Sequence, residues 1–298
     1  KATIPIEEKI DVSEEIKQPS GLQLQQQSQK VALENNKVRF KFTNTQNGLR
    51  LTSVENLQTN RVYQLVEADL WSIILRHNSG SKTVISPSNI QSNFSYAFKV
   101  MPNKKILTLI WSGMEITSND VLKVEAVIEL EDNSPTANFW IKTSINQTSQ
   151  YSIYRADYPI VILQKLSNIH DEALLTPFVM GRLIINPRTY VPIYGELPYQ
   201  SQLAIIQMHA YYDIVTEDLV YFASRDPNGY TKNYGLNISS QSLGFSTIHF
   251  PENNLITKNY LAPFSSAFGV FKGDWFDAAS YYRSWAIKQS FVSRGKLK

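Results

Sequence analysis

Charged side chains flank a short run of turn-forming residues in the second half of the sequence. Residues 226–229 (DPNG) follow one another in the order that a type I turn favours, with a side-chain acceptor first and glycine last. The pattern predicts a hairpin turn. Loops at the ends of sheets also carry binding residues. A second interpretation is therefore that Arg225, Asp226 and Lys232 present charge towards a ligand or a neighbouring domain.

A row of polar and aromatic side chains is predicted on one face of an apolar segment. His209 and Tyr211 alternate with apolar neighbours in residues 207–212 (QMHAYY). Such a row could line a sugar groove, or it could be half-buried with its polar atoms satisfied. Trp140 lies between Phe139 and Ile141 and therefore on the opposite face of its strand from both. Its ring is a further candidate to stack on a sugar.

Other kinds of site find no support in the residue pattern. The 4 histidines are scattered singly, without the short spacing that metal sites use, so we predict no metal site. No glycine-rich phosphate loop is present, and we predict no cofactor. Carboxylate pairs that cleave glycosides are defined by their separation in space, which a sequence does not display. We therefore assign no catalytic residue.

Composition narrows the classes of partner. The chain has 298 residues, enough to bury a sizeable core, and its formal net charge is +3, from 29 basic and 26 acidic residues. No dense basic cluster is present to follow a phosphate backbone, so nucleic acid is not an expected partner. Apolar runs such as residues 203–206 are far shorter than the roughly 20 residues of a membrane helix. The absence of cysteine excludes disulfides and a thiol nucleophile.

The elements that would position these residues are mostly strands. Residues 1–30 combine charges with a polar tract at 23–29 (QLQQQSQ), which predicts a linker. Period-two alternation then predicts half-buried strands at residues 38–43, 122–131 and 139–145. The further predicted strands are 72–76, 106–111, 160–163, 203–212 and 219–223. A long series of strands without crossover helices favours two packed antiparallel sheets, a mainly β sandwich over residues 31–272.

One helix is predicted in the C-terminal segment, residues 273–298. Its apolar residues recur at three- and four-residue spacing: Trp275, Ala278, Ala279, Tyr282, Trp285 and Ala286. Asp274 is a good N-cap, and Asp277 favours the positive end of the helix dipole. We expect this stripe to pack on the sandwich and Phe276, Tyr281 and Phe291 to stay partly exposed, as a docking face for another domain.

Four stretches resemble a family of bacterial glycoside hydrolase-like proteins. They are residues 177–187, residues 207–213 (QMHAYYD), residues 221–232 (YFASRDPNGYTK) and residues 271–286 (FKGDWFDAASYYRSWA), and they fall in the order of the family. In that family a galactose-mutarotase-like supersandwich precedes a (β/α)8 barrel, with distant similarity to endo-α-N-acetylgalactosaminidases. Two departures, Ser224-Arg225 and Ser290-Phe291, stand where the family has other residues.

The resemblance implies a role for each part of the chain. The helix, with Trp275, Phe276, Tyr281 and Phe291, would lead towards a catalytic barrel that carries the carboxylates at the ends of its strands. The sandwich itself would be non-catalytic, supporting the barrel and able to contact the glycan or polysaccharide substrate. Because the first residue is Lys1, we expect that an upstream piece, such as a signal peptide, has been removed. The expected location is secreted, periplasmic or at the cell surface.

Two other functions compete with the accessory sandwich. The first is a stand-alone carbohydrate-binding or cell-surface structural protein, which the polar tether and the candidate exposed aromatic rings favour. The second is an aldose mutarotase-like isomerase, because the same fold hosts such enzymes, although fold alone does not establish an activity. Mutarotation needs a carboxylate base and a histidine acid converging on one sugar, and the histidines here match no such motif.

Overall fold

The computed structural model describes residues 30–165, 171–179, 181–189, 195–201, 204–251 and 257–292. Strands account for most of them, with one short 3-10 helix, η2 (Pro187–Thr189), and one α-helix, α1 (Trp275–Ala286). The strands are β1 (Lys30–Glu34), β2 (Val38–Thr45), β3 (Gly48–Asn56), β4 (Arg61–Gln64), β5 (Ser72–His77), β6 (Lys82–Ile85), β7 (Asn93–Met101), β8 (Lys104–Thr117), β9 (Asp120–Glu131), β10 (Thr136–Ile145), β11 (Tyr151–Gln164), β12 (Glu172–Thr176), β13 (Arg182–Ile185), β14 (Glu196–Pro198), β15 (Met208–Asp213), β16 (Asp218–Arg225), β17 (Lys232–Ile238), β18 (Ser242–His249), β19 (Asn259–Leu261) and β20 (Ser265–Lys272).

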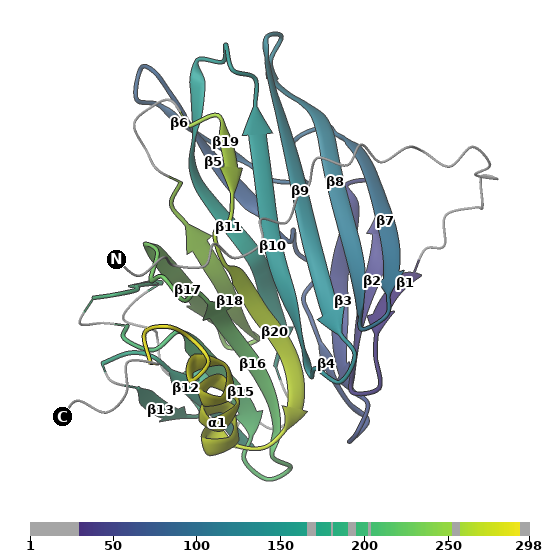
Figure 1. Ribbon diagram of the computed structural model, residues 1–298, viewed down its shortest axis with the longest axis vertical. Coiled ribbons are helices and arrows are strands. Elements are labelled where there is room, and N and C mark those ends of the chain that lie inside the picture. The colour runs from purple at the N-terminus through teal and green to yellow at the C-terminus, as the bar shows by residue number, and fades with distance from the viewer. Residues whose placement is uncertain are drawn as a thin grey trace, which may run out of the picture.

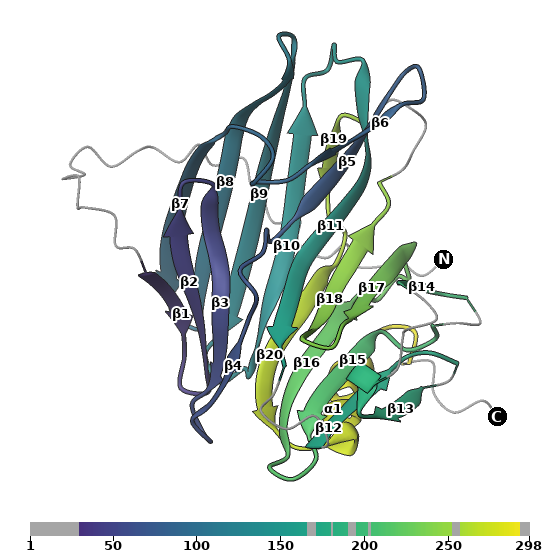
Figure 2. The same cartoon turned by 180° about the vertical axis from the view of Figure 1, so that it is seen from behind.

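Three antiparallel sheets form two layers (Figures 1 and 2). One layer is a 10-stranded sheet in the order β13-β12-β15-β16-β20-β10-β9-β8-β7, with β19 added beside β10. The other layer consists of a 4-stranded sheet, β1-β2-β3-β4, and a 6-stranded sheet, β14-β17-β18-β11-β5-β6. Every pairing between these strands is antiparallel. The predicted β-sandwich is confirmed.

The core lies between the layers and follows the predicted alternation. On β9 the apolar side chains from Leu122 to Leu130 that alternate along the strand are fully buried, while the residues between them are exposed or half-buried. Phe40 of β2, Phe139 of β10 and Phe268 of β20 contact one another, with ring centroids 6.0–6.3 Å apart. Aromatic rings therefore join the 4-stranded sheet to the 10-stranded sheet, at separations that favour attraction.

Helix α1 packs on the outer face of the 10-stranded sheet, against β15 and β16 (Figure 1). It begins as predicted, because the Asp274 carboxylate accepts from the backbone N–H groups of Phe276 and Asp277. The Asp277 carboxylate in turn accepts from the backbone N–H of Asp274, which completes a capping box. Ala278 and Ala286 are buried, so small side chains allow the helix to lie close to the sheet. The prediction for Trp275 as part of the buried stripe is wrong: in the first turn, its ring packs on Phe276 and is 44% exposed.

Some predictions concern residues outside the described ranges. The linker predicted for residues 1–30 lies there, except for Lys30, which opens β1. His170 and Leu203 are also outside, and the strand predicted from Leu203 begins instead at Met208. Within the described residues, no helix is both long and apolar enough to span a bilayer.

Candidate functional site

The turn at residues 226–231 connects the two layers of the sandwich at one of its ends. β16 belongs to the 10-stranded sheet and β17 to the 6-stranded sheet. The prediction of a hairpin is therefore wrong, because the strands on either side of the turn do not pair with each other. The turn residues themselves behave as expected. Asp226 Oδ1 accepts from the backbone N–H groups of Asn228 and Gly229 at 2.9 Å each, and Gly229 has a φ of +70°.

Asp226 and Lys232 form a buried ion pair across this turn. The Lys232 ammonium donates to Asp226 Oδ2 at 2.5 Å, and both side chains are 0% exposed. The ammonium also donates to the carbonyl of Tyr230 at 3.1 Å and lies 4.0 Å from the ring centroid of Tyr199 and 4.6 Å from that of Phe264. Burial lowers the pKa of Lys232 to about 8, against the opposing effect of Asp226. The two charges predicted to face a ligand therefore hold the turn together from inside.

Arg225 points to the opposite face of the sheet and fastens α1. Its guanidinium donates to the hydroxyls of Thr136 and Tyr281, each at 3.2 Å. The Tyr281 ring packs edge-on against Tyr221 and at a tilt of 53° against Phe271, with ring centroids 5.1 Å apart in both cases. Tyr281, which we expected to remain available to another domain, is thus half-buried in the contact between helix and sheet.

His209 and Tyr211 lie in the core, so neither ring has a free face for a sugar. His209 is enclosed by Tyr234 at 5.3 Å and Phe245 at 5.5 Å, and burial lowers its pKa to about 3, which keeps it neutral. Neither of its ring nitrogens has a hydrogen-bond partner within the described structure. The row is fully buried, in contrast to the groove or the half-buried row that the alternation suggested.

A second buried ion pair, which the sequence did not reveal, provides the hydrogen-bond partner of the Tyr211 hydroxyl. Arg188 Nε donates to Glu172 Oε2 at 2.9 Å, with both side chains 0% exposed, and another Arg188 nitrogen donates to the Tyr211 hydroxyl at 2.9 Å. Arg188 directly follows the Asn186-Pro187 pair of the family resemblance. This position beside the Asn186-Pro187 pair was the only indication in the sequence that Arg188 has a structural role. Nothing in the sequence indicates that Arg188 contacts Glu172.

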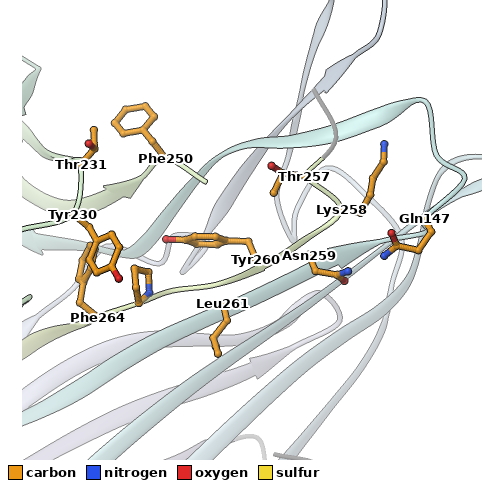
Figure 3. A pocket seen from close by; sticks show the side chains of 11 residues that line it. Gln147, Tyr230, Thr231, Phe250, Thr257, Lys258, Asn259, Tyr260, Leu261 and Phe264 are labelled. Atoms are coloured by element: carbon orange, nitrogen blue, oxygen red, sulfur yellow. The ribbon is translucent and has the colours of Figure 1, made fainter. Parts of the chain in front are cut away.

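An open cavity of about 640 Å³ lies beside the turn (Figure 3). Its described lining is mainly aromatic and polar: Gln147, Tyr230, Thr231, Phe250, Thr257, Lys258, Asn259, Tyr260, Leu261, Pro263 and Phe264. None of these residues is a carboxylate, whereas glycoside cleavage uses two. The described part of the lining can therefore hold a ligand but offers no acid–base pair for hydrolysis. Sequence reasoning missed this cavity, although Tyr230 stands inside the stretch YFASRDPNGYTK.

Apart from Tyr281, the predicted interdomain residues are exposed. Phe276 is 62% exposed and Phe291 49%, and Trp275 joins them at 44%. Ile287 and Val292 are also exposed large apolar residues of this segment. Trp140, the remaining predicted site residue, is half-buried on β10. It is remote from α1 in sequence and takes part in neither the Arg188–Glu172 nor the Lys232–Asp226 ion pair.

Histidine–carboxylate chemistry of the mutarotase kind has no support among the described residues. His77 pairs with Ser79, and His249 pairs with Tyr158 and Tyr260, while His209 has no partner. No hydrogen bond joins any of the three to a carboxylate. No group of three potential metal ligands occurs in the described part of the chain.

Comparison with known proteins places the fold. No protein-family model and no curated protein sequence matches the chain. Solved structures do match it. The α-N-acetylgalactosaminidase NagBb from Bifidobacterium bifidum has a TM-score of 0.65 at 12% identity, covering 90% of this chain and 40% of its own.

Two further solved structures agree with that match. An α-galactosidase from Lactobacillus brevis has a TM-score of 0.52 at 10% identity and covers 87% of this chain and 42% of its own. A GH36 α-galactosidase from Geobacillus stearothermophilus, in complex with raffinose, also scores 0.52, at 8% identity, and covers 90% of this chain and 44% of its own. The chain thus spans less than half the length of each. It has the fold of the galactose-mutarotase-like supersandwich that was predicted from the sequence.

Proposed function

We propose that the chain is the non-catalytic β-sandwich domain of a secreted glycoside hydrolase-like protein that acts on a glycan. Its α1 face, defined as Trp275, Phe276 and Phe291, packs against the catalytic barrel of that protein. The observation that carries the proposal is the exposure of this face, 44%, 62% and 49% for the three rings. Trp275 and Phe276 are in contact at the start of α1, and Phe291 follows its C-terminal end. Large apolar side chains that are exposed along one short segment indicate an interaction surface.

The lengths of the similar structures support a catalytic domain as the occupant of the face. This chain matches 40%, 42% and 44% of the three hydrolases, each of which therefore has further chain beyond the shared sandwich. Catalysis is assigned to the barrel, because glycoside cleavage needs two available carboxylates. Asp226, in the stretch 221–232, and Glu172, on β12, are each held in a buried ion pair.

The test compares the complete gene product with the isolated chain. Aryl α-N-acetylgalactosaminide and aryl α-galactoside are the substrates, and we expect turnover only by the complete protein. Replacing Trp275 and Phe276 together by serine should lower the melting temperature of the complete protein and leave that of the isolated chain within experimental error. Phe98→Ser, at a β7 residue that is 46% exposed, is the matched control and should affect neither.

Two results would contradict the proposal. One is turnover by the isolated chain. The other is a gene that encodes no segment long enough for a barrel. Equal melting temperatures of the complete wild-type protein and its Trp275/Phe276 variant would remove α1 as the docking face.

A further inference from the structure

The cavity beside the turn contains a fixed aromatic platform. Tyr230 is 46% exposed and stacks on Phe264, with centroids 6.4 Å apart and planes inclined by 27°. Phe264 is 2% exposed and stacks in turn on His249 at 4.9 Å and 21°. The Lys232 ammonium lies over the Phe264 ring. Because buried groups hold Phe264 in place, the Tyr230 ring is supported from behind and presents an apolar surface to the cavity.

The hydroxyl oxygen of Tyr260 is available to a ligand as a hydrogen-bond acceptor. His249 Nε2 lies 3.2 Å from the carbonyl oxygen of Tyr158, which can only accept, so this nitrogen carries the proton. Burial lowers the pKa of His249 to about 4, and the ring is neutral. Nδ1 of His249 is therefore an acceptor, and the Tyr260 hydroxyl donates a hydrogen bond to it, with the two heavy atoms 3.1 Å apart. The oxygen lone pairs of Tyr260 remain available to a ligand hydroxyl.

The other end of the cavity carries uncharged polar groups. The amides of Gln147 and Asn259 line that end, while the Tyr260 hydroxyl is directed towards Tyr230 (Figure 3). An amide side chain can both donate and accept a hydrogen bond.

The described lining contains one charged residue, away from the platform. Lys258 lies at the end of the cavity opposite Tyr230 (Figure 3) and donates its ammonium protons to the carbonyls of Ser149, at 2.7 Å, and Tyr151. Beneath the platform, the charge of Lys232 is matched by Asp226. Among the described residues, a ligand on the platform would therefore find hydrogen-bonding groups and an aromatic surface but no unpaired charge beside it.

We propose that this cavity is a binding site for a neutral pyranose unit of a glycan. The apolar face of the sugar ring stacks on Tyr230, a sugar hydroxyl donates to the Tyr260 oxygen, and the amides of Gln147 and Asn259, at the other end of the cavity, bind hydroxyls of a neighbouring unit of the glycan. The cavity volume of about 640 Å³ lies within the range of small-molecule sites. This inference goes beyond the proposed function, since it involves no residue of the α1 face and no catalytic domain.

The test is titration of the isolated chain with sugars of known charge, by calorimetry and saturation-transfer NMR. The neutral probes are the methyl α-glycosides of galactose, N-acetylgalactosamine and glucose, and galacturonate is the anionic probe. We expect at least one neutral probe to bind with a millimolar dissociation constant and galacturonate to bind at least tenfold more weakly than its neutral counterpart. Tyr230→Ala should weaken binding about tenfold, the change that 1.4 kcal/mol of binding free energy produces.

Two further variants separate binding from folding. Asn259→Ala, at an exposed residue at the other end of the cavity, should change neither the binding of these single-sugar probes nor the melting temperature. Phe98→Ala, with the same 46% exposure as Tyr230 but on β7, should leave binding unchanged. The inference is overturned if no neutral probe binds at tens of millimolar, if galacturonate binds more tightly than galactoside, or if Tyr230→Ala retains full affinity. These outcomes concern sugar binding by the isolated chain and do not depend on the proposed function.

Discussion

Replacing Lys232 by methionine tests whether the turn is held by a buried charge pair. Methionine has a stem of similar length, so it keeps the packing against Tyr199 and Phe264 while the positive charge is lost. The two charged groups are 2.5 Å apart and 0% exposed. Removing one partner of such a pair leaves an uncompensated buried charge, which costs about 3–5 kcal/mol of unfolding free energy. We expect about 3 kcal/mol, because two backbone N–H groups still bind the Asp226 carboxylate.

A double-mutant cycle isolates the interaction. Asp226→Asn keeps the Oδ1 acceptor that closes the turn but removes the negative charge. The double variant, with Lys232→Met, has neither charge, so it should be more stable than Lys232→Met alone by about 2 kcal/mol. The control is Lys123→Met, which removes one partner of the Lys123–Glu125 pair, where the lysine side chain is 46% exposed. We expect a change below about 0.5 kcal/mol there.

The assay is urea unfolding at pH 7, followed by tryptophan fluorescence and far-ultraviolet circular dichroism. Coincident transitions from the two probes would justify two-state free energies. A loss of unfolding free energy below about 1 kcal/mol for Lys232→Met would refute the argument, since a buried unpaired carboxylate should destabilise the folded state by more than that. Additive single effects in the cycle would refute it equally, because they would mean that the two charges do not interact.

Two further predictions rest on other local features. Gly269→Ala should cost about 3 kcal/mol or more, because its Cβ would lie 2.1 Å from the carbonyl oxygen of Pro135; a variant with wild-type urea midpoint would refute the close approach. Asp274→Ala should cost about 1 kcal/mol by removing both side-chain caps of α1, and hydrogen exchange should report faster exchange of the Phe276 amide; Asp274→Asn should be close to neutral.

The candidate site could be predicted only in part, and the turn illustrates why. Residues 226–229 have the composition of a turn, and they form one. The same composition also fits a hairpin, and no local signal indicates that β16 and β17 belong to different sheets. Asp226 and Lys232 resemble an exposed charged loop, because the rings of Tyr199 and Phe264 that enclose Lys232 come from distant segments of the chain.

Two features could be predicted from local sequence: which faces of the strands are buried, and where the C-terminal helix begins. Both are local properties, because side-chain direction alternates along a strand and the carboxylate of Asp274 binds N–H groups two and three residues away. Three other features depend on contacts between distant segments: the order of strands in the sheets, the burial of His209 and Tyr211, and the cavity lined by Tyr230 and Tyr260. Period-two alternation specifies that a face is covered but not which segment covers it, because any apolar partner satisfies the same pattern.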